Sequence, residues 1–141
     1  FNRFTQYFDS DFPTAKQIIV TPKNKLKECG LSTNKLSTII EIATQEENEG
    51  LENRKGFEVM SDIQIIQKLT KIKGIGEGTA QMLMIFNLGK LDIFPVGDFA
   101  LKKNYSLFKN IASPINMKDL SKISEEWKPF RSIAAWYLWQ Y

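Results

Sequence analysis

The segment Lys71-Ile72-Lys73-Gly74-Ile75-Gly76 constrains the fold of this chain more than any other. Apolar residues at helix spacing flank it on both sides. Those before it are Ile63, Ile66 and Leu69, and those after it are Ala80, Leu83 and Met84. This spacing predicts a helix, a very tight turn and a second helix. Glycine suits such a turn because it reaches positive φ and leaves the backbone open to a large ligand.

The start of the second helix predicts an anion site. The first N–H groups of a helix have no partner within it, so a phosphate group binds there readily. A second motif, Phe94-Pro95-Val96-Gly97-Asp98, follows about twenty residues later and brings one carboxylate, Asp98, to the start of another helix. Together the two motifs predict a clamp for a nucleic-acid backbone beside an acid.

Composition limits the chemistry that the chain can carry. Its 141 residues, 43% of them hydrophobic, are enough for one buried core. With no histidine and a single cysteine, Cys29, the sequence excludes a histidine base, a disulfide framework and a cysteine-ligated zinc or iron–sulfur site made by this chain alone. No apolar run approaches the roughly 18 residues that span a membrane. Carboxylates, lysines and tyrosines remain as acid–base groups.

Charge is distributed unevenly, although the net charge is only +3. Residues 68–90 carry four lysines against one glutamate, a net of +3. Residues 41–58 carry six glutamates against one arginine and one lysine, a net of −4. We interpret the acidic run as a solvated helix face. The basic run surrounds the glycine turn, where we favour contact with phosphate.

Helix signals follow one another along the chain, with almost no strand signal. In the first half of the chain we expect helices over residues 1–8, from Phe12-Pro13-Thr14 to about Val20, from Thr21 (N-cap) and Pro22 to Gly30, and after the N-cap Ser32. Gly50 to about Met60 is expected to be a loop. In the second half we expect helices after the N-cap Ser61, over roughly 77–88, after Asp98, from Pro114 to Pro129, and from about Arg131. These signals predict one all-α domain over residues 1–141.

Spacing within these helices predicts which faces are buried. The second hairpin helix is apolar on most faces and is expected to be central to the core. The other inward positions are Leu36, Ile39, Ile40 and Ala43; Leu101, Tyr105 and Phe108; Leu120, Ile123 and Trp127; and, by default, Trp136, Tyr137 and Trp139.

Five segments in this order resemble the helix-hairpin-helix DNA glycosylases over nearly the whole chain. They are Phe12-Pro13-Thr14, residues 26–42, the glycine turn, residues 94–98 and Trp127-Lys128-Pro129-Phe130-Arg131-Ser132. Within that superfamily the chain is most similar to 3-methyladenine DNA glycosylase II. The resemblance implies a helix-hairpin-helix bundle, with the motif at about 62–88. The family's upstream helix, with its Gln-Gln-Ile-Ser-like run, has no counterpart in residues 1–20. The resemblance therefore implies that the family's N-terminal helices are missing here, because the sequence is either a fragment of a longer chain or a shortened relative.

The resemblance also implies an activity. The chain is expected to be a DNA glycosylase of base excision repair that hydrolyses the N-glycosidic bond of alkylated purines, such as 3-methyladenine, in duplex DNA. Its catalytic aspartate falls on Asp98. A carboxylate there would stabilise positive charge on the sugar and orient or deprotonate the attacking water. Asp98 also reads simply as an N-cap, and the two roles are compatible.

The resemblance assigns DNA contacts to the hairpin. These are Lys73, Gly74, Ile75, Gly76, Gly78 and Thr79, through backbone amides and the Thr79 hydroxyl. It also places a monovalent cation on the backbone carbonyls of Ile72 and Ile75, with no other cofactor required. Such contacts position a duplex without reading its bases. The alternative is a tight interhelical turn that binds nothing.

A base pocket is implied at four positions. Trp139 matches a tryptophan that lines the family's pocket, and Phe99 matches a tyrosine. Two further aromatic positions correspond to Gly78 and Met82, which implies a roomier and less aromatic pocket. Gly78 also stands where strand-cutting relatives carry a lysine, so no Schiff-base nucleophile is expected.

Two other functions are alternatives to the DNA glycosylase. One is a helix-hairpin-helix module that binds duplex DNA without chemistry, and the other is an all-α interaction domain with no nucleic-acid role. The glycosylase is expected to act as a monomer on DNA, in a bacterial cytoplasm or a eukaryotic nucleus, with no membrane partner.

Overall fold

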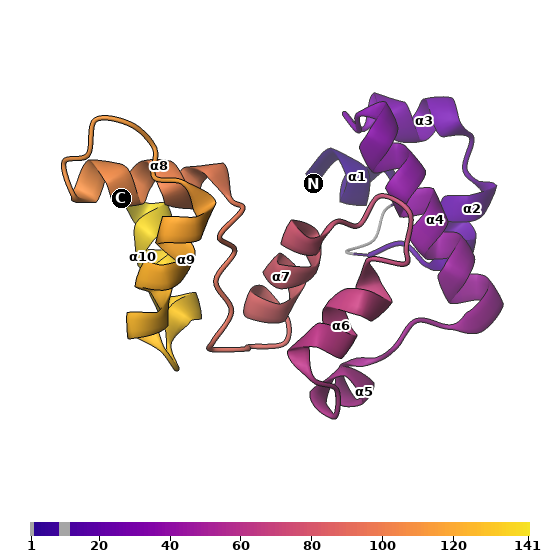
Figure 1. Cartoon of the computed structure of the whole chain (residues 1–141). Coiled ribbons are helices and arrows are strands. Elements are labelled where there is room, and N and C mark those ends of the chain that lie inside the picture. Colours follow the sequence, from indigo (N-terminus) through magenta and orange to yellow (C-terminus); the bar gives the residue numbers. More distant parts are fainter. Residues whose placement is uncertain (1, 9–11) are drawn as a thin grey trace. The chain divides into compact units, whose positions relative to one another are not determined.

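The computed structural model describes residues 2–8 and 12–141, whose helices fall into two compact units (Figure 1). The N-terminal unit is Phe1–Gly76 and the C-terminal unit is Glu77–Tyr141. The predicted all-α class is confirmed, and within the described ranges no helix has the length and apolarity needed to cross a membrane. Of the helix expected over residues 1–8, Phe1 lies outside the described residues. A single domain over 1–141 stays a prediction.

The N-terminal unit is built around one long helix. Its elements are α1 (Asn2–Tyr7), α2 (Ala15–Val20), α3 (Lys23–Glu28), α4 (Thr33–Glu49), α5 (Arg54–Glu58) and α6 (Asp62–Leu69). Helices α2 and α3 both pack against α4. The expected caps of α4 and α6 are confirmed: Ser32 accepts from Lys35 N, and Ser61 forms a capping box with Gln64. Leu36 and Ala43 of the predicted stripe are buried, and Ile39 and Ile40 are half-buried.

Two sequence predictions for this unit are wrong. Thr21 does not cap α3, because its hydroxyl donates to the Gln17 carbonyl at 2.6 Å and closes α2, so Pro22 takes the N-cap. The segment expected as a loop contains α5. Its N-cap is Asn53, whose side chain accepts from Gly56 N at 3.0 Å. Burial of Phe57 then stabilises a helix too short to be recognised by its period.

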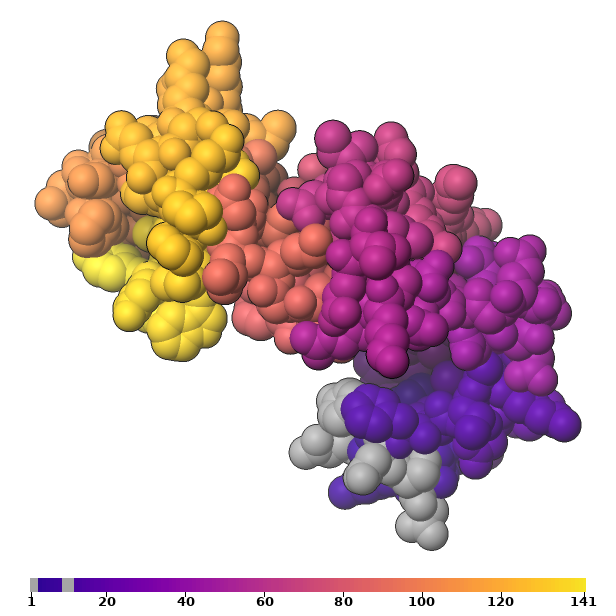
Figure 2. Space-filling model, turned by 90° about the horizontal axis from the view of Figure 1, so that it is seen from below, coloured from indigo at the N-terminus to yellow at the C-terminus, as the bar shows by residue number. Residues whose placement is uncertain are grey.

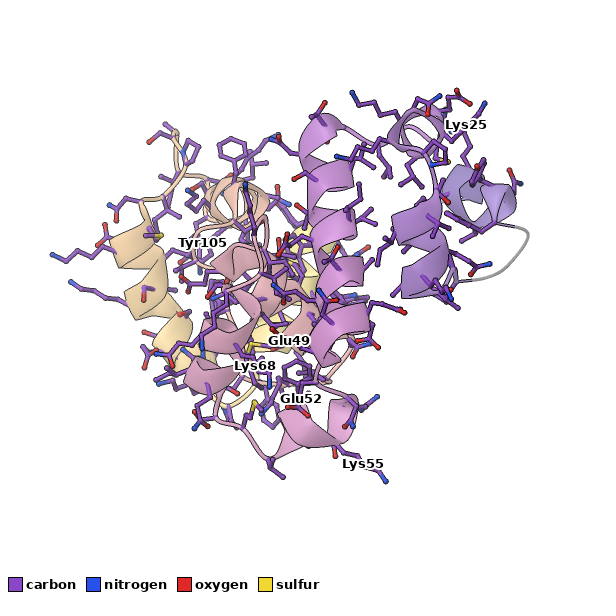
Figure 3. The ribbon with its side chains drawn as sticks, turned by 90° about the vertical axis from the view of Figure 1, so that its right-hand side faces the viewer. Lys25, Glu49, Glu52, Lys55, Lys68 and Tyr105 are labelled. Atoms are coloured by element: carbon purple, nitrogen blue, oxygen red, sulfur yellow. The ribbon has the colours of Figure 1, made fainter. Side chains whose placement is uncertain are left out.

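An ion pair ties α6 to the segment before α5. Lys68 Nζ lies 2.8 Å from Glu52 Oε2, and Figure 3 shows the two side chains meeting between these elements. Lys68 therefore has a partner within its own unit. Of the lysines near the glycine turn, Lys71 and Lys73 make no ion pair with any described residue of the N-terminal unit.

The C-terminal unit closes around its own apolar cluster. Its elements are α7 (Glu77–Phe86), α8 (Phe99–Phe108), α9 (Met117–Ser124), the 3₁₀ turn η1 (Glu125–Trp127) and α10 (Arg131–Gln140). The buried cluster consists of Phe94, Leu101, Tyr105, Leu120 and Ala135, with Ile123, Trp127 and Trp139 packed against it. Helix α10 packs against α8. The cluster joins α8, α9 and α10 to the Phe94–Asp98 motif.

Three aromatic residues predicted to be buried are instead exposed. Phe108 is 53% exposed, Trp136 47% and Tyr137 65%. In α10 the buried positions are Ser132 and Ala135, three residues apart, so Tyr137 falls on the opposite face and Trp136 at the border of the buried one. Residues of α9 and α10, in yellow, form much of the face of this unit seen in Figure 2. Helix α7 buries Ala80 and Met84, whereas its last residue, Phe86, is exposed.

Candidate active site

Asp98 ends the short segment that leads into α8. Two tight turns precede it, with Val96 N donating to Phe94 O and Asp98 N donating to Pro95 O, both at 2.8 Å. Phe94 and Pro95 are buried, so the segment is anchored before the chain turns into the helix. Asp98 Oδ1 then accepts from Leu101 N at 2.8 Å. The predicted N-cap is confirmed.

A second donor reaches the same carboxylate oxygen. The indole Nε1 of Trp139, in the last turn of α10, donates to Asp98 Oδ1 at 3.3 Å. The Trp139 ring packs against Phe86, with the ring centroids 5.7 Å apart. Within residues 77–141, both hydrogen bonds to the Asp98 carboxylate end on Oδ1. Oδ2 therefore keeps its acceptor capacity for a ligand.

Asp98 lines a cleft of about 600 Å³ within the C-terminal unit. The other lining residues come from the first turns of α7, from residues 95–97 and from α9. Of the predicted site residues, Gly78, Thr79 and Met82 line this cleft beside Asp98. Trp139 is not a lining residue and contacts Asp98 from α10, while Phe99 is 66% exposed and lies outside the lining.

Outside the motif of residues 94–98, sequence reasoning missed three residues of the cleft: Glu77, Gln81 and Met117. The signal for Gln81 was available, because it stands four residues after Glu77 on the helix that carries Gly78 and Met82. Gln81 Nε2 donates to Glu77 Oε1 at 3.2 Å. Met117 gives no such signal, since it lies on another helix and only tertiary packing brings it to the cleft. The charged lining residues are Glu77 and Asp98, both acidic.

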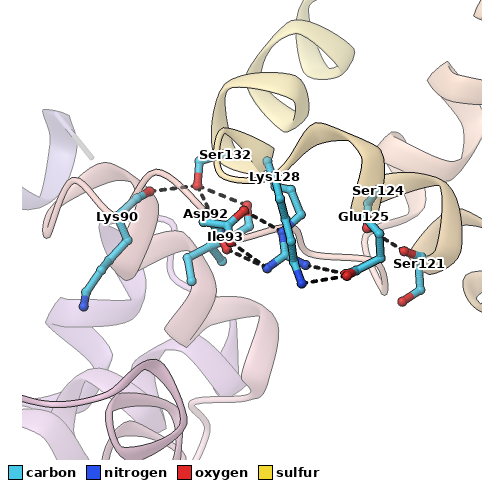
Figure 4. Close-up of polar contacts among 9 residues, drawn as sticks. Lys90, Asp92, Ile93, Ser121, Ser124, Glu125, Lys128 and Ser132 are labelled. Carbon is cyan, nitrogen blue, oxygen red and sulfur yellow. Dashed lines mark hydrogen bonds and ion pairs between the residues drawn. The ribbon is translucent and has the colours of Figure 1, made fainter.

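The first residues of α10 hold the segment that leads to Asp98 (Figure 4). Ser132 is buried, and its Oγ accepts from Ile93 N at 2.9 Å and donates to Lys90 O at 2.7 Å. Next to it, Arg131 binds the Asp92 carboxylate through Nε and Nη2, which form one edge of its guanidinium. The hydrogen bond from Arg131 is the main cause that lowers the pKa of the Asp92 carboxyl below its ordinary value. The backbone before Asp98 is thus fixed by side chains from a distant part of the sequence.

The glycine turn belongs to the N-terminal unit. Gly74 has φ +96°, and a Cβ there would collide with the side chain of Thr38 on α4. Gly76 differs, because a Cβ there would meet nothing within 4 Å. The fold itself therefore requires glycine at Gly74, whereas at Gly76 glycine only leaves the backbone open.

Two predicted cation ligands also lie in this turn. Ile72 O accepts from Ile75 N at 3.0 Å, which leaves one lone pair of that carbonyl for a cation. Among residues 2–8 and 12–141, no group of three or more Cys, Asp and Glu side chains is placed to hold a metal ion. A cation at the turn would therefore rest on neutral backbone oxygens.

Comparison with known proteins identifies relatives along nearly the whole chain. Residues 1–130 match the family described as HhH-GPD superfamily base excision DNA repair protein. The chain is 40% identical over 141 residues to the alkylbase DNA glycosidase-like protein mag2 of Schizosaccharomyces pombe, covering 99% of this chain and 66% of that protein. It is 33% identical to DNA-3-methyladenine glycosylase 1 of the same organism, covering 99% and 62%.

A solved structure is also similar. The Schizosaccharomyces pombe 3-methyladenine DNA glycosylase Mag1, determined in complex with abasic DNA, superposes with a TM-score of 0.91 at 32% identity, covering 99% of this chain and 68% of that one. The chain thus spans slightly less than two thirds of the length of the two curated relatives above.

Proposed function

Because the chain belongs to the HhH-GPD superfamily of base excision DNA repair proteins, we propose that it carries the active site of a DNA glycosylase acting on alkylated purines in duplex DNA. One observation supports this above the others. Asp98 stands at the N-terminus of α8, held by two hydrogen bonds on one oxygen, at the wall of a cleft. Such a carboxylate is preorganised before any substrate arrives.

The chemistry follows from the position of the charge. Breaking the N-glycosidic bond of a purine nucleotide leaves positive charge on the sugar, and a fixed carboxylate stabilises that charge. Oδ2 of Asp98 can also accept a proton from the attacking water. The chain has no histidine to protonate the leaving base. An alkylated purine that is already cationic leaves as a neutral base, so this step requires no general acid.

The cleft suits a cationic base for a second reason. Its charged lining residues, Glu77 and Asp98, are both acidic, and the lining contains no lysine or arginine. Met82 and Met117 add polarisable apolar surface. A flipped purine that carries positive charge would be attracted here. We assign the base to this cleft, with Met82 in its lining and Trp139 in contact with Asp98 outside the lining; Phe99, exposed outside the lining, is the least supported pocket residue.

The DNA backbone is assigned to the hairpin. Lys73, Gly74 and Gly76 are exposed in the turn and Ile75 is half-buried; Gly78 and Thr79 follow in the first turn of α7. Open backbone at Gly76 and the absence of an ion pair on Lys73 within its unit support phosphate contact. A monovalent cation on Ile72 and Ile75 carbonyls would strengthen that contact. Gly78 has no side chain to act as an amine nucleophile, which supports base release without strand cleavage.

The test compares wild type with Asp98→Asn on a duplex that contains 3-methyladenine. Wild type should release the free base and leave an intact strand with an abasic site. The variant should release base at least about 100-fold more slowly, as expected for the loss of a preorganised charge. It should bind a duplex with a tetrahydrofuran abasic analogue as tightly as wild type. Asp119→Asn, an aspartate of α9 outside the cleft lining, is the matched control and should behave as wild type.

Other outcomes identify the competing functions. Binding of duplex DNA with no base release by wild type would establish the non-catalytic binding module. No binding at low salt would favour the interaction domain. Full activity of Asp98→Asn would refute the glycosylase mechanism.

A further inference from the structure

We propose that Trp139 is a positioning residue, whose indole N–H fixes the plane of the Asp98 carboxylate so that Oδ2 points to the reacting sugar. The inference rests on the proposed function of Asp98 and adds a role that differs from lining a base pocket. It starts from the hydrogen bond of 3.3 Å between Trp139 Nε1 and Asp98 Oδ1.

Two donors from different elements meet on one oxygen. Leu101 N belongs to the helix that Asp98 caps, and Trp139 Nε1 reaches it from α10. A single N-cap bond leaves the carboxylate free to rotate about its last torsion, because that torsion is broad. A second donor from another direction removes this freedom. With both hydrogen bonds on Oδ1, that oxygen has no acceptor capacity left, and Oδ2 remains as the oxygen that acts on the substrate.

The Trp139 ring is itself held in place. It packs against Phe86 and against the apolar cluster of the C-terminal unit. Close to it, Asn104 Nδ2 of α8 donates to the carbonyl of Leu138 at 2.7 Å. The Trp139 side chain therefore loses little further conformational freedom when it donates to Asp98, as a residue that positions another side chain must.

Helix α10 connects to the Asp98 segment at both of its ends. At its start, Ser132 binds the backbone of Lys90 and Ile93, and at its end Trp139 binds Asp98. Helix α10 therefore holds residues 90–98 in place at two points. A packing tryptophan needs no polar contact with the N-cap of another helix, whereas a positioning tryptophan does.

The experiment uses Trp139→Phe, which keeps an aromatic ring and removes the donor. Single-turnover release of 3-methyladenine from a duplex should fall about tenfold, the size expected for losing one hydrogen bond to a charged group. Affinity for the tetrahydrofuran duplex should stay within about twofold, because the lost hydrogen bond orients the Asp98 carboxylate and does not bind the DNA. Trp136→Phe, at an exposed position of the same helix, is the control and should release base at the wild-type rate. Trp139→Phe should cause no further loss when added to Asp98→Asn.

A second readout does not depend on activity. In ¹H–¹⁵N spectra the Trp139 indole resonance, assigned through Trp139→Phe, should shift and lose protection from solvent exchange in Asp98→Ser. Serine keeps an oxygen for the N-cap bond to Leu101, so α8 retains its cap. The Trp136 indole resonance should not move.

The outcomes separate the two proposals. A wild-type protein that releases no base refutes the proposed function, while the indole spectra still decide whether Trp139 binds Asp98. Unchanged base release by Trp139→Phe, or an unchanged Trp139 indole resonance in Asp98→Ser, would overturn the positioning role.

Discussion

Arg131 holds the carboxylate of Asp92 through two hydrogen bonds, from Nε to Oδ1 at 2.7 Å and from Nη2 to Oδ2 at 3.0 Å. Its Nη2 also donates to the Asp92 carbonyl at 3.1 Å, and Nη1 donates to Glu125 at 3.0 Å. Arg131 is the first residue of α10, and Asp92 precedes the segment that ends at Asp98. The pair therefore joins the helix that carries Trp139 to the backbone that delivers the candidate catalytic acid.

Arg131→Lys should lower the free energy of unfolding of the C-terminal unit by about 1–2 kcal/mol, because an ammonium cannot form the two parallel bonds. All three tryptophans lie in residues 127–139, so tryptophan fluorescence in urea follows this unit specifically. Lys128→Gln, which breaks a pair with Glu125 whose side chains are 47% and 54% exposed, should change stability by no more than about 0.5 kcal/mol. Equal effects of the two changes would contradict this ranking.

Acid should weaken the same unit through Asp92. The pKa of its carboxyl is lowered in the fold, first by the hydrogen bond from Arg131, so the unfolded chain takes up a proton at a higher pH than the folded one. The stabilisation is present above the ordinary carboxyl range and is lost as pH falls through the lowered pKa, below about pH 4. Urea midpoints from pH 6 to pH 3 should fall less steeply in Asp92→Asn than in wild type. Parallel curves would show that Asp92 is not linked to stability.

Ser132→Ala should cost about 1–3 kcal/mol, because it leaves the buried N–H of Ile93 without its acceptor. Ser124 is equally buried, but its hydroxyl donates only to Ser121 O within α9. Ser124→Ala should therefore change the urea midpoint much less, since alanine favours the helix. A reversed order would mean that the hydroxyl of Ser132 does not hold the segment before Asp98.

Gly74→Ala should destabilise the N-terminal unit more than Gly50→Ala. Both glycines have positive φ, +96° and +72°, which costs alanine about 1–2 kcal/mol at either position. Only at Gly74 does the new Cβ also meet a neighbour, the side chain of Thr38, whereas at Gly50 nothing lies within 4 Å. Thermal unfolding followed by helix circular dichroism measures both variants. Equal losses would show that the turn moves away from α4 without cost.

Gly78 should set the size of the candidate base cleft. It lies in the first turn of α7, and a Cβ there would meet nothing within 4 Å, so Gly78→Ala should keep or raise stability by up to about 1 kcal/mol. Gly78→Leu should reduce release of a bulky alkylated purine more than release of 3-methyladenine, because the new side chain would fill part of the cleft. Equal losses for the two bases would place the base elsewhere.

Much of the fold could be predicted from sequence because its signals are local. The caps Thr14, Ser32 and Ser61 each bind backbone within three residues, and so does Asp98 at the start of α8. The errors arose where another part of the chain decided the outcome. Phe57 gains burial that makes a five-residue helix stable, and Tyr137 faces outward because Ser132 and Ala135 occupy the inner face of α10.

In the candidate site, too, local features could be predicted from the sequence and contacts between distant residues could not. The sequence alone determined the helix order, the N-cap role of Asp98 and the glycine turn, since turn and capping chemistry act over a few residues. Only the tertiary structure decided that Trp139, 41 residues away, donates to the oxygen of Asp98 that caps α8, and that Glu77 and Met117 face the same cleft. Contacts between distant residues depend on how helices pack, and that packing is set by the shape of the shared core rather than by any local pattern.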